Sequence, residues 1–181
     1  MNLSQPYELA PGNITLKLAA QIPLENQPLP EGLPADALPE TVKNCYLLVV
    51  SDPSNKIIPL KMRVINASPQ GFGVGQSMWV NLTPYIIGGK VGSVTLNIKP
   101  NTTFISAPPA AGLDDCPVQL GYADPSGKGA RQFYSTVWRH DPTGRNVIFV
   151  TASPKSKIPK ITGFPDFRVS ESQEKEGAEG N

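Results

Sequence analysis

The stretch "TVWRHDPTGRNVIFV", residues 136–150, sets two runs rich in β-branched and aromatic residues on either side of a short polar segment. Short runs of this composition, bounded by Gly, Pro and Asp, are typical of β-strands. In the polar segment "HDPTGR" (140–145), the aspartate can accept hydrogen bonds from backbone amides two residues on, and the proline presets φ for the turn. The stretch therefore predicts two strands joined by a tight turn.

The same turn pattern occurs three times, as "SDPSNK" (51–56), "ADPSGK" (123–128) and "HDPTGR" (140–145). In each copy Asn or Gly is expected to take the positive φ that closes a short hairpin, and the final basic residue is expected to point into water. The turns imply three hairpins: 44–50 with 57–66, 117–123 with 130–138, and 130–138 with 145–152. Because the last two share a strand, they predict a three-stranded meander.

Counting the strands of these hairpins, the chain as a whole is predicted to contain about nine short strands, separated by Gly, Pro and Asn clusters, with no convincing amphipathic helix. The continuously apolar "NCYLLVV" (44–50) is expected to be a central strand covered on both faces. This pattern predicts an all-β fold, an antiparallel β-sandwich that is immunoglobulin-like in the broad sense.

Length and composition predict one folded domain with additions. The chain has 181 residues, with 20 prolines spread along it that disfavour long helices. We expect a single β-sandwich domain over 1–152, in which 22–40 is a Pro-rich surface connection. Residues 153–169 are expected to form a basic, Pro-spaced extension with Phe164 and Phe167 as anchors. Residues 170–181 are rich in Glu and are predicted to be a disordered acidic tail.

The charge balance and the hydropathy limit which partners and which cellular compartment we expect. A formal net charge of +1 gives no general attraction for nucleic acid. No apolar run of membrane-spanning length is present. The N-terminus lacks the basic start and apolar centre of a signal peptide, so a leader is not visible. An extracellular or periplasmic location is expected, with the cytoplasm as the alternative.

Cys45 and Cys116 are the two cysteines. Two isolated cysteines favour buried thiols or one disulfide over a metal site. A disulfide would close a loop of about 70 residues and contribute roughly 4 kcal/mol. Both alternatives stay open at the level of sequence.

The one histidine, His140, precedes Asp141 and suggests a catalytic pair. Neighbouring side chains on a strand point to opposite faces, however, and the turn already requires Asp141. One histidine and two distant cysteines fall short of a structural zinc set. Asp114 and Asp115 leave an oxygen-only calcium site open, without the usual loop spacing. We therefore predict no catalytic, cofactor-binding or metal-ligating residue, and no enzyme.

Other motifs have structural interpretations that compete with functional ones. The glycine-rich segments 71–77 and 87–93 do not match a phosphate-binding loop and are expected to serve turns and bulges. Aromatic residues that would suit a sugar-stacking platform are Trp79, Tyr85, Phe133, Tyr134 and Trp138. N-glycosylation sequons occur at Asn13, Asn66, Asn81 and Asn101.

Two segments, "FGVGQSMWVNLTPYIIGGKVGSVTLNIKPNTTFI" and "STVWRHDPTGRNVIFV", resemble stretches in a group of uncharacterised bacterial β-rich proteins regarded as secreted. The likeness spans roughly residues 44–151 and implies an envelope or exported location, with no residue role attached. With no catalytic constellation, the expected function is a non-catalytic envelope or extracellular module for protein interaction or structural support. The alternatives are a carbohydrate-binding module that uses exposed aromatic residues and a hydrolase of unrecognised type. The expected partner is another envelope protein or a glycan.

Overall fold

A computed structural model describes residues 4–24, 27–153 and 156–166. The described chain is all-β, as predicted, with twelve strands in place of the expected nine or so. The strands are β1 (Ile14–Lys17), β2 (Ala35–Leu38), β3 (Cys45–Ser51), β4 (Leu60–Asn66), β5 (Ser77–Asn81), β6 (Ile86–Val91), β7 (Val94–Ile98), β8 (Thr103–Ser106), β9 (Asp114–Ala123), β10 (Arg131–His140), β11 (Arg145–Ser153) and β12 (Ser156–Asp166). None of the described residues belongs to a helix with the length and hydropathy needed to cross a membrane.

The chain divides into two compact units, Gln5–Gly71 and a second that begins at Phe72. The predicted single domain over 1–152 therefore differs from these units at two places. It missed a boundary at residue 71, because the strands on its two sides have the same composition. It also placed the C-terminal boundary before β12, a strand of the second unit.

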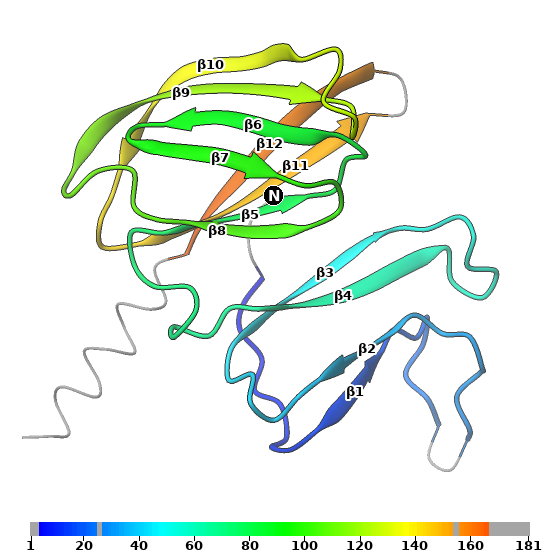
Figure 1. The fold of residues 1–181 in the computed structure, drawn as a ribbon. Helices are drawn as coiled ribbons and strands as arrows, with labels where there is room; N and C mark the ends of the chain where they lie inside the picture. Colours follow the sequence, from blue (N-terminus) through cyan, green and yellow to red (C-terminus); the bar gives the residue numbers. More distant parts are fainter. Residues whose placement is uncertain (1–3, 25–26, 154–155, 167–181) are drawn as a thin grey trace, which may run out of the picture. The chain divides into compact units, whose positions relative to one another are not determined.

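The second unit is the predicted sandwich of two four-stranded sheets, in the orders β10-β9-β6-β7 and β12-β11-β5-β8 (Figure 1). Alternating apolar side chains of the strands turn inward to form its core. The buried core residues are Trp79, Ile87, Val91, Leu96, Ile98, Val118, Leu120, Ile148 and Val150. All pairs but one are antiparallel, the exception being β5 with β11.

The third predicted hairpin is wrong. β10 pairs with β9, whereas β11 lies in the other sheet between β12 and β5. The turn at 141–144 thus connects the two sheets and closes no hairpin. The burial of the two strands explains the difference. Val147 and Ile148 of β11 lie on opposite faces and are both buried, which is typical of a central strand. Most residues of β10 are exposed, because β10 lies at a sheet edge. The hairpins β3–β4 and β9–β10 confirm the other two predictions.

The segment 153–169 is not an extension outside the domain. Its residues 156–166 form β12, which pairs with β11 from Arg145 to Ser153. β12 is an edge strand, where proline is tolerated because one row of amides needs no partner, so the prolines misled the sequence interpretation. Phe164 is buried, as its anchor role requires. Phe167 and the predicted tail 170–181 lie outside the described residues.

In the first unit, β1 pairs with β2 and β3 pairs with β4. The Pro-rich connection 22–40 is therefore not wholly irregular, since β2 lies within it and pairs along Ile14–Lys17. β3 was expected to be a central strand covered on both faces. It is instead one strand of a two-stranded sheet, and its Leu47 and Val49 side chains are 48% and 41% exposed.

Candidate functional site

The three Asp-Pro turns share the predicted hydrogen bonds. Asp141 Oδ1 accepts bonds from the backbone N and the Oγ1 of Thr143, at 2.8 and 2.7 Å. Asp52 and Asp124 accept the equivalent bonds from Ser54 and Ser126. The side-chain hydrogen bond is the main reason that the pKa of each aspartate lies below its ordinary value.

The three turns differ in the backbone conformation of the residue that follows Pro-Ser or Pro-Thr, which is Asn55, Gly127 or Gly144. Gly127 has the expected positive φ, of 78°. Asn55 and Gly144 are not among the described residues with positive φ, so that part of the turn prediction is wrong for two copies. Their turns close through the aspartate bonds without a left-handed residue.

His140 ends β10 and is buried. A Cβ built on Gly75 would lie 3.7 Å from its Cε1, so the ring packs beside the loop 72–76. Its Nε2 has no hydrogen-bond partner among the described residues. A nucleophile–base pair needs a hydroxyl or thiol on one ring nitrogen. Among the described residues, no hydroxyl or thiol is hydrogen bonded to Nε2 of His140, and the Asp141 carboxylate accepts its hydrogen bonds from Thr143.

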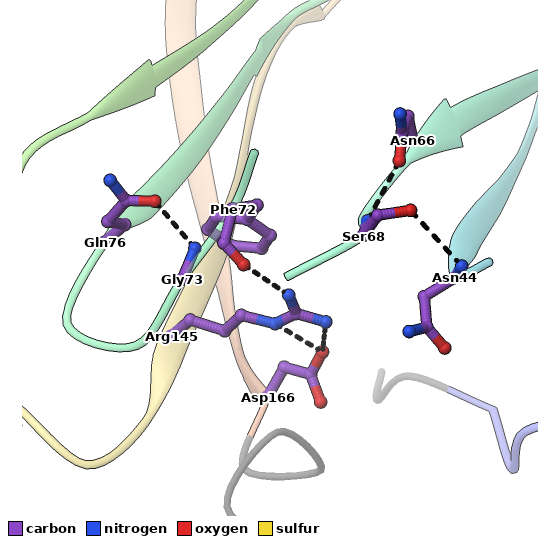
Figure 2. Close-up of polar contacts among 8 residues, drawn as sticks. All are labelled: Asn44, Asn66, Ser68, Phe72, Gly73, Gln76, Arg145 and Asp166. Atoms are coloured by element: carbon purple, nitrogen blue, oxygen red, sulfur yellow. Dashed lines mark hydrogen bonds and ion pairs between the residues drawn. The ribbon is translucent and has the colours of Figure 1, made fainter. Parts of the chain in front are cut away.

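The expectation that the basic residue after each turn points into water is wrong for Arg145. It is 4% exposed, and its Nη2 lies 3.2 Å from Oδ2 of Asp166 at the end of β12. Its Nη1 donates to the carbonyl oxygen of Phe72 at 2.6 Å, and its guanidinium lies 4.5 Å from the centre of the Phe72 ring. Figure 2 shows these contacts, which tie β11, β12 and the first residue of the second unit together.

In the glycine-rich loop 71–77 the amides of the three glycines are already hydrogen bonded within the protein. The Gly73 amide donates to Oε1 of Gln76 at 2.7 Å (Figure 2), and the Gly75 amide donates to the carbonyl of Gly144 at 2.6 Å. The loop is thus fastened to itself and to the turn at 141–144. An anion site needs several unpaired amides aimed at one point.

The acidic pair at the start of β9 is in contact with β10. The Asp115 carboxylate lies 3.3 Å from Nη1 of Arg139, and both side chains are well exposed. Asp114 Oδ1 accepts the backbone N–H of Asp115. Within residues 4–24, 27–153 and 156–166, no group of three or more His, Cys, Asp or Glu side chains is arranged to hold a metal ion.

The aromatic residues considered for a sugar platform pack on one another. Trp79 is fully buried and stacks on Trp138, with ring centroids 5.9 Å apart. Tyr134 meets Trp138 edge-on, and its hydroxyl accepts the indole N–H of Trp138 at 3.1 Å. All five are buried or half-buried, and four of them pack against the hydrophobic core around Trp79. The main role of these aromatic side chains is to pack the interior of the sandwich.

The sequon at Asn81 is part of the folded core. Its Nδ2 donates to the carbonyl oxygens of Tyr85 and Lys99 at 2.8 and 3.0 Å, and its Oδ1 accepts the N–H and hydroxyl of Thr83. The side chain is fully buried, so the folded protein cannot present it for glycosylation. The other sequon asparagines, Asn13, Asn66 and Asn101, are exposed. Asn66 also accepts the Ser68 N–H at 2.9 Å, beside the Ser68–Asn44 bond (Figure 2).

Both cysteines are free thiols, so the disulfide alternative does not apply to this structure. Burial raises the pKa of the half-buried Cys45 thiol. Burial also raises the pKa of Cys116, and the neighbouring charges of Asp114 and Asp115 add to the effect. Raised pKa values keep both groups protonated and poorly nucleophilic near neutral pH.

Two surface features were not singled out from the sequence. One is the outer edge of β3, which no other described strand covers. The other is a hollow of about 350 Å³ on the sheet β10-β9-β6-β7, lined in part by Gly88 and Gly121. The sequence signal for the hollow was "IIGGKV", whose glycines were assigned to a turn or bulge but lie inside β6.

Comparisons with protein-family models, with curated proteins and with solved structures find no match to this chain.

Proposed function

We propose that this protein is a non-catalytic interaction module that binds an extended segment of another protein along β3. The observation that carries the proposal is the open, uncharged edge of this strand. β3 pairs with β4 alone among the described strands, and its sequence "CYLLVVS" contains no charged residue and no proline. Exposed edges of this kind accept an added strand, and natural proteins usually block them with charge or proline.

The β3–β4 ladder fixes which amides face outward. Val64 of β4 donates its N–H to Oδ2 of Asp36 at 2.7 Å and so does not donate to its partner Leu47. In an antiparallel pair, opposite residues either exchange both hydrogen bonds or neither. The N–H and C=O of Leu47, and of Val49 two residues on, therefore point away from β4. Asp36 covers the β4 edge at Val64, which leaves β3 as the receptive side.

The exposed side chains specify the kind of partner. Leu47 and Val49 present an apolar surface beside the outward amides. An added strand gains main-chain hydrogen bonds from the edge and specificity from side chains that pack on these two residues. We expect the partner segment to be extended, apolar at alternate positions and free of charge where it crosses Val49. An exported or envelope location is part of this proposal, supported by the resemblance of residues 44–151 and testable by cell fractionation with an antibody.

The test is affinity capture with the full chain, followed by direct titration of the captured protein. Val49→Lys places a charge on the apolar face, and Leu47→Pro removes an outward N–H without removing a bond to β4. Each is expected to weaken binding of the same purified partner at least tenfold. Val74→Lys, at an exposed apolar residue of the second unit, is the control and leaves binding unchanged.

Two outcomes would overturn the proposal. One is a partner that binds Val49→Lys and Leu47→Pro as tightly as wild type while circular dichroism shows both variants folded. The other is saturable binding to a polysaccharide that these substitutions do not affect, which would favour a carbohydrate-binding module.

A further inference from the structure

The main-chain groups along β3 alternate in a pattern that is fixed at both ends of the strand. Just before β3, the Asn44 carbonyl oxygen accepts the Ala67 N–H at 2.8 Å. Just after β3, the Asp52 N–H donates to the Pro59 carbonyl oxygen at 2.9 Å. The even-numbered residues therefore bond to β4, in agreement with the alternation found in the middle of the strand. The N–H and C=O groups of residues 45, 47, 49 and 51 point away from β4.

This outward pattern is complementary to a second copy of itself. In an antiparallel pair, hydrogen bonds form only where outward-facing residues of one strand meet outward-facing residues of the other. With a two-fold axis at Leu48, Leu47 of one copy lies opposite Val49 of the other, and Cys45 lies opposite Ser51. Every outward group of both strands is then used, in about eight hydrogen bonds. Such a two-fold contact closes with two copies and leaves neither β3 edge open.

The side chains on the exposed face of β3 match in the same register. Leu47 and Val49 are 48% and 41% exposed. In the pairing about Leu48, each Leu47 lies across from a Val49 of the other copy, so two apolar cross-strand pairs form. Apolar pairs directly opposite each other are the side-chain contacts that stabilise antiparallel strands. The pairing therefore covers apolar surface as well as main-chain groups.

The charges that flank β3 favour the antiparallel direction. Lys43, which is exposed, precedes the strand, and Asp52 follows it. Hydrogen bonds from Ser54 hold the pKa of Asp52 below its ordinary value, so Asp52 is anionic at neutral pH. An antiparallel pair brings Lys43 of each copy toward Asp52 of the other, whereas a parallel pair would bring like charges together. Both ends of the contact thus gain from complementary charge.

We propose that two copies of this chain pair their β3 strands antiparallel when no partner is bound. The second copy then covers the edge that a partner segment would use. This regulatory role rests on the proposed function, whereas the pairing itself does not. One strand against one strand is a small contact, so we expect a weak and reversible dimer with a dissociation constant in the micromolar range or above. A partner segment with better matched side chains displaces the second copy.

The first test is sedimentation velocity of the purified full chain from micromolar to millimolar concentration. The wild type is expected to shift from monomer to dimer as the concentration rises. Val49→Lys is expected to raise the dimer dissociation constant at least tenfold, because each new charge would lie opposite Leu47. Lys43→Glu is expected to raise it severalfold, because it would face Asp52 with a like charge. Lys17→Glu, the same charge change at an exposed residue of β1, is the control and leaves it unchanged.

The second test is a disulfide across the contact. Ser51→Cys places a thiol opposite Cys45 of the other copy, at the Cα separation of about 5.5 Å that a hydrogen-bonded pair has and a disulfide tolerates. Within one chain the two positions lie about 20 Å apart along the strand, so only a second copy can complete the bond. Oxidation with diamide is expected to give a covalent dimer in which peptide mapping finds Cys45 linked to position 51.

Val49→Cys is the matched control, since it lies on the same face but opposite Leu47. It is expected to give no covalent dimer. A link from position 49 to Cys45, or to itself, would overturn the register about Leu48.

Three results would overturn the pairing. The first is a wild type that stays monomeric throughout the concentration range. The second is a Val49→Lys variant that associates as wild type does while circular dichroism shows it folded. The third is a Ser51→Cys variant that stays unlinked at concentrations where it is dimeric.

The proposed function and the pairing can fail separately, because self-association is measured on the chain alone. A monomeric wild type that captures a partner overturns only the pairing, and a dimer that captures none overturns only the proposed function. With a purified partner, the oxidised Ser51→Cys dimer is expected to bind at least tenfold more weakly than the same protein after reduction. Equal binding in the two states would overturn the regulatory role.

Discussion

The second unit contains two Arg–Asp ion pairs of nearly equal length, one buried and one exposed, so the effect of burial on the contribution of an ion pair to stability can be measured. Arg145 and Asp166 lie 3.2 Å apart, with side chains 4% and 0% exposed. Arg139 and Asp115 lie 3.3 Å apart, with side chains 63% and 62% exposed. Distance alone predicts equal contributions, whereas solvation predicts very different ones.

Removing one member of the buried pair takes the opposite charge away from the other member in the protein interior. We expect Asp166→Ala to lower the free energy of unfolding by about 3–5 kcal/mol, and Asp115→Ala by about 0–1 kcal/mol. Replacing both buried partners, with Arg145→Met and Asp166→Leu, removes both charges from the interior. The double variant is expected to recover the loss except for about 1–3 kcal/mol, because the Phe72 carbonyl keeps no donor from Arg145.

The assay is urea unfolding of the full chain, followed by the fluorescence of Trp79 and Trp138, which stack in the same unit. Asp166→Asn, which retains an acceptor oxygen, serves in place of Asp166→Ala if the alanine variant does not fold. A difference of less than about 1 kcal/mol between Asp166→Ala and Asp115→Ala would show that burial does not determine the contribution of these pairs.

Three further outcomes are expected. Gly89→Ala should unfold at a markedly lower temperature than Gly88→Ala, since a Cβ at position 89 would lie 2.0 Å from the Gln119 carbonyl oxygen, whereas one at position 88 would lie 3.6 Å from the Leu96 carbonyl oxygen, an ordinary contact; equal melting temperatures in calorimetry would contradict the distinction between these glycines. Ser126→Ala should raise the pKa of Asp124 toward its ordinary value of 3.8, measured by NMR titration. Because the folded pKa is the lower one, the stabilisation by Asp124 is complete above the unfolded pKa and is lost as pH falls through the folded pKa. Asn81→Ala should cost about 2–5 kcal/mol in a thermal melt, because the part-buried carbonyl oxygens of Tyr85 and Lys99 lose their donor; a loss below about 1 kcal/mol would argue that water replaces the amide.

Local chemistry was predictable from the sequence, and long-range pairing was not. The bonds from Thr143 to Asp141 follow from residues two apart, so the turn could be recognised from its letters. The same bonds do not determine which strand the chain pairs with after the turn. Arg145 shows the limit most clearly: its partner Asp166 lies 21 residues away, beyond any local pattern.

The candidate site was missed for the same kind of reason. The sequence "IIGGKV" shows two glycines, but only the positions of the Gln119 and Leu96 carbonyl oxygens distinguish Gly89, which the backbone requires, from Gly88, which it does not. The apolar composition of β3 was likewise correct evidence for a strand. It could not show that only one neighbour would pair with it.

The parallel pairing of β5 with β11 has a consequence for synthesis of the chain. Ser77 of β5 pairs beside Asn146 of β11, about 70 residues later, so at 5–20 residues per second the ribosome delivers the second strand roughly 3–14 s after the first. During that interval β5 can pair with β8 on one side, but Met78, Trp79 and Val80 have an unfilled edge on the other. The nascent sandwich thus passes through a state with an apolar central strand half paired, in which chaperone binding to β5 would compete with premature association of neighbouring chains.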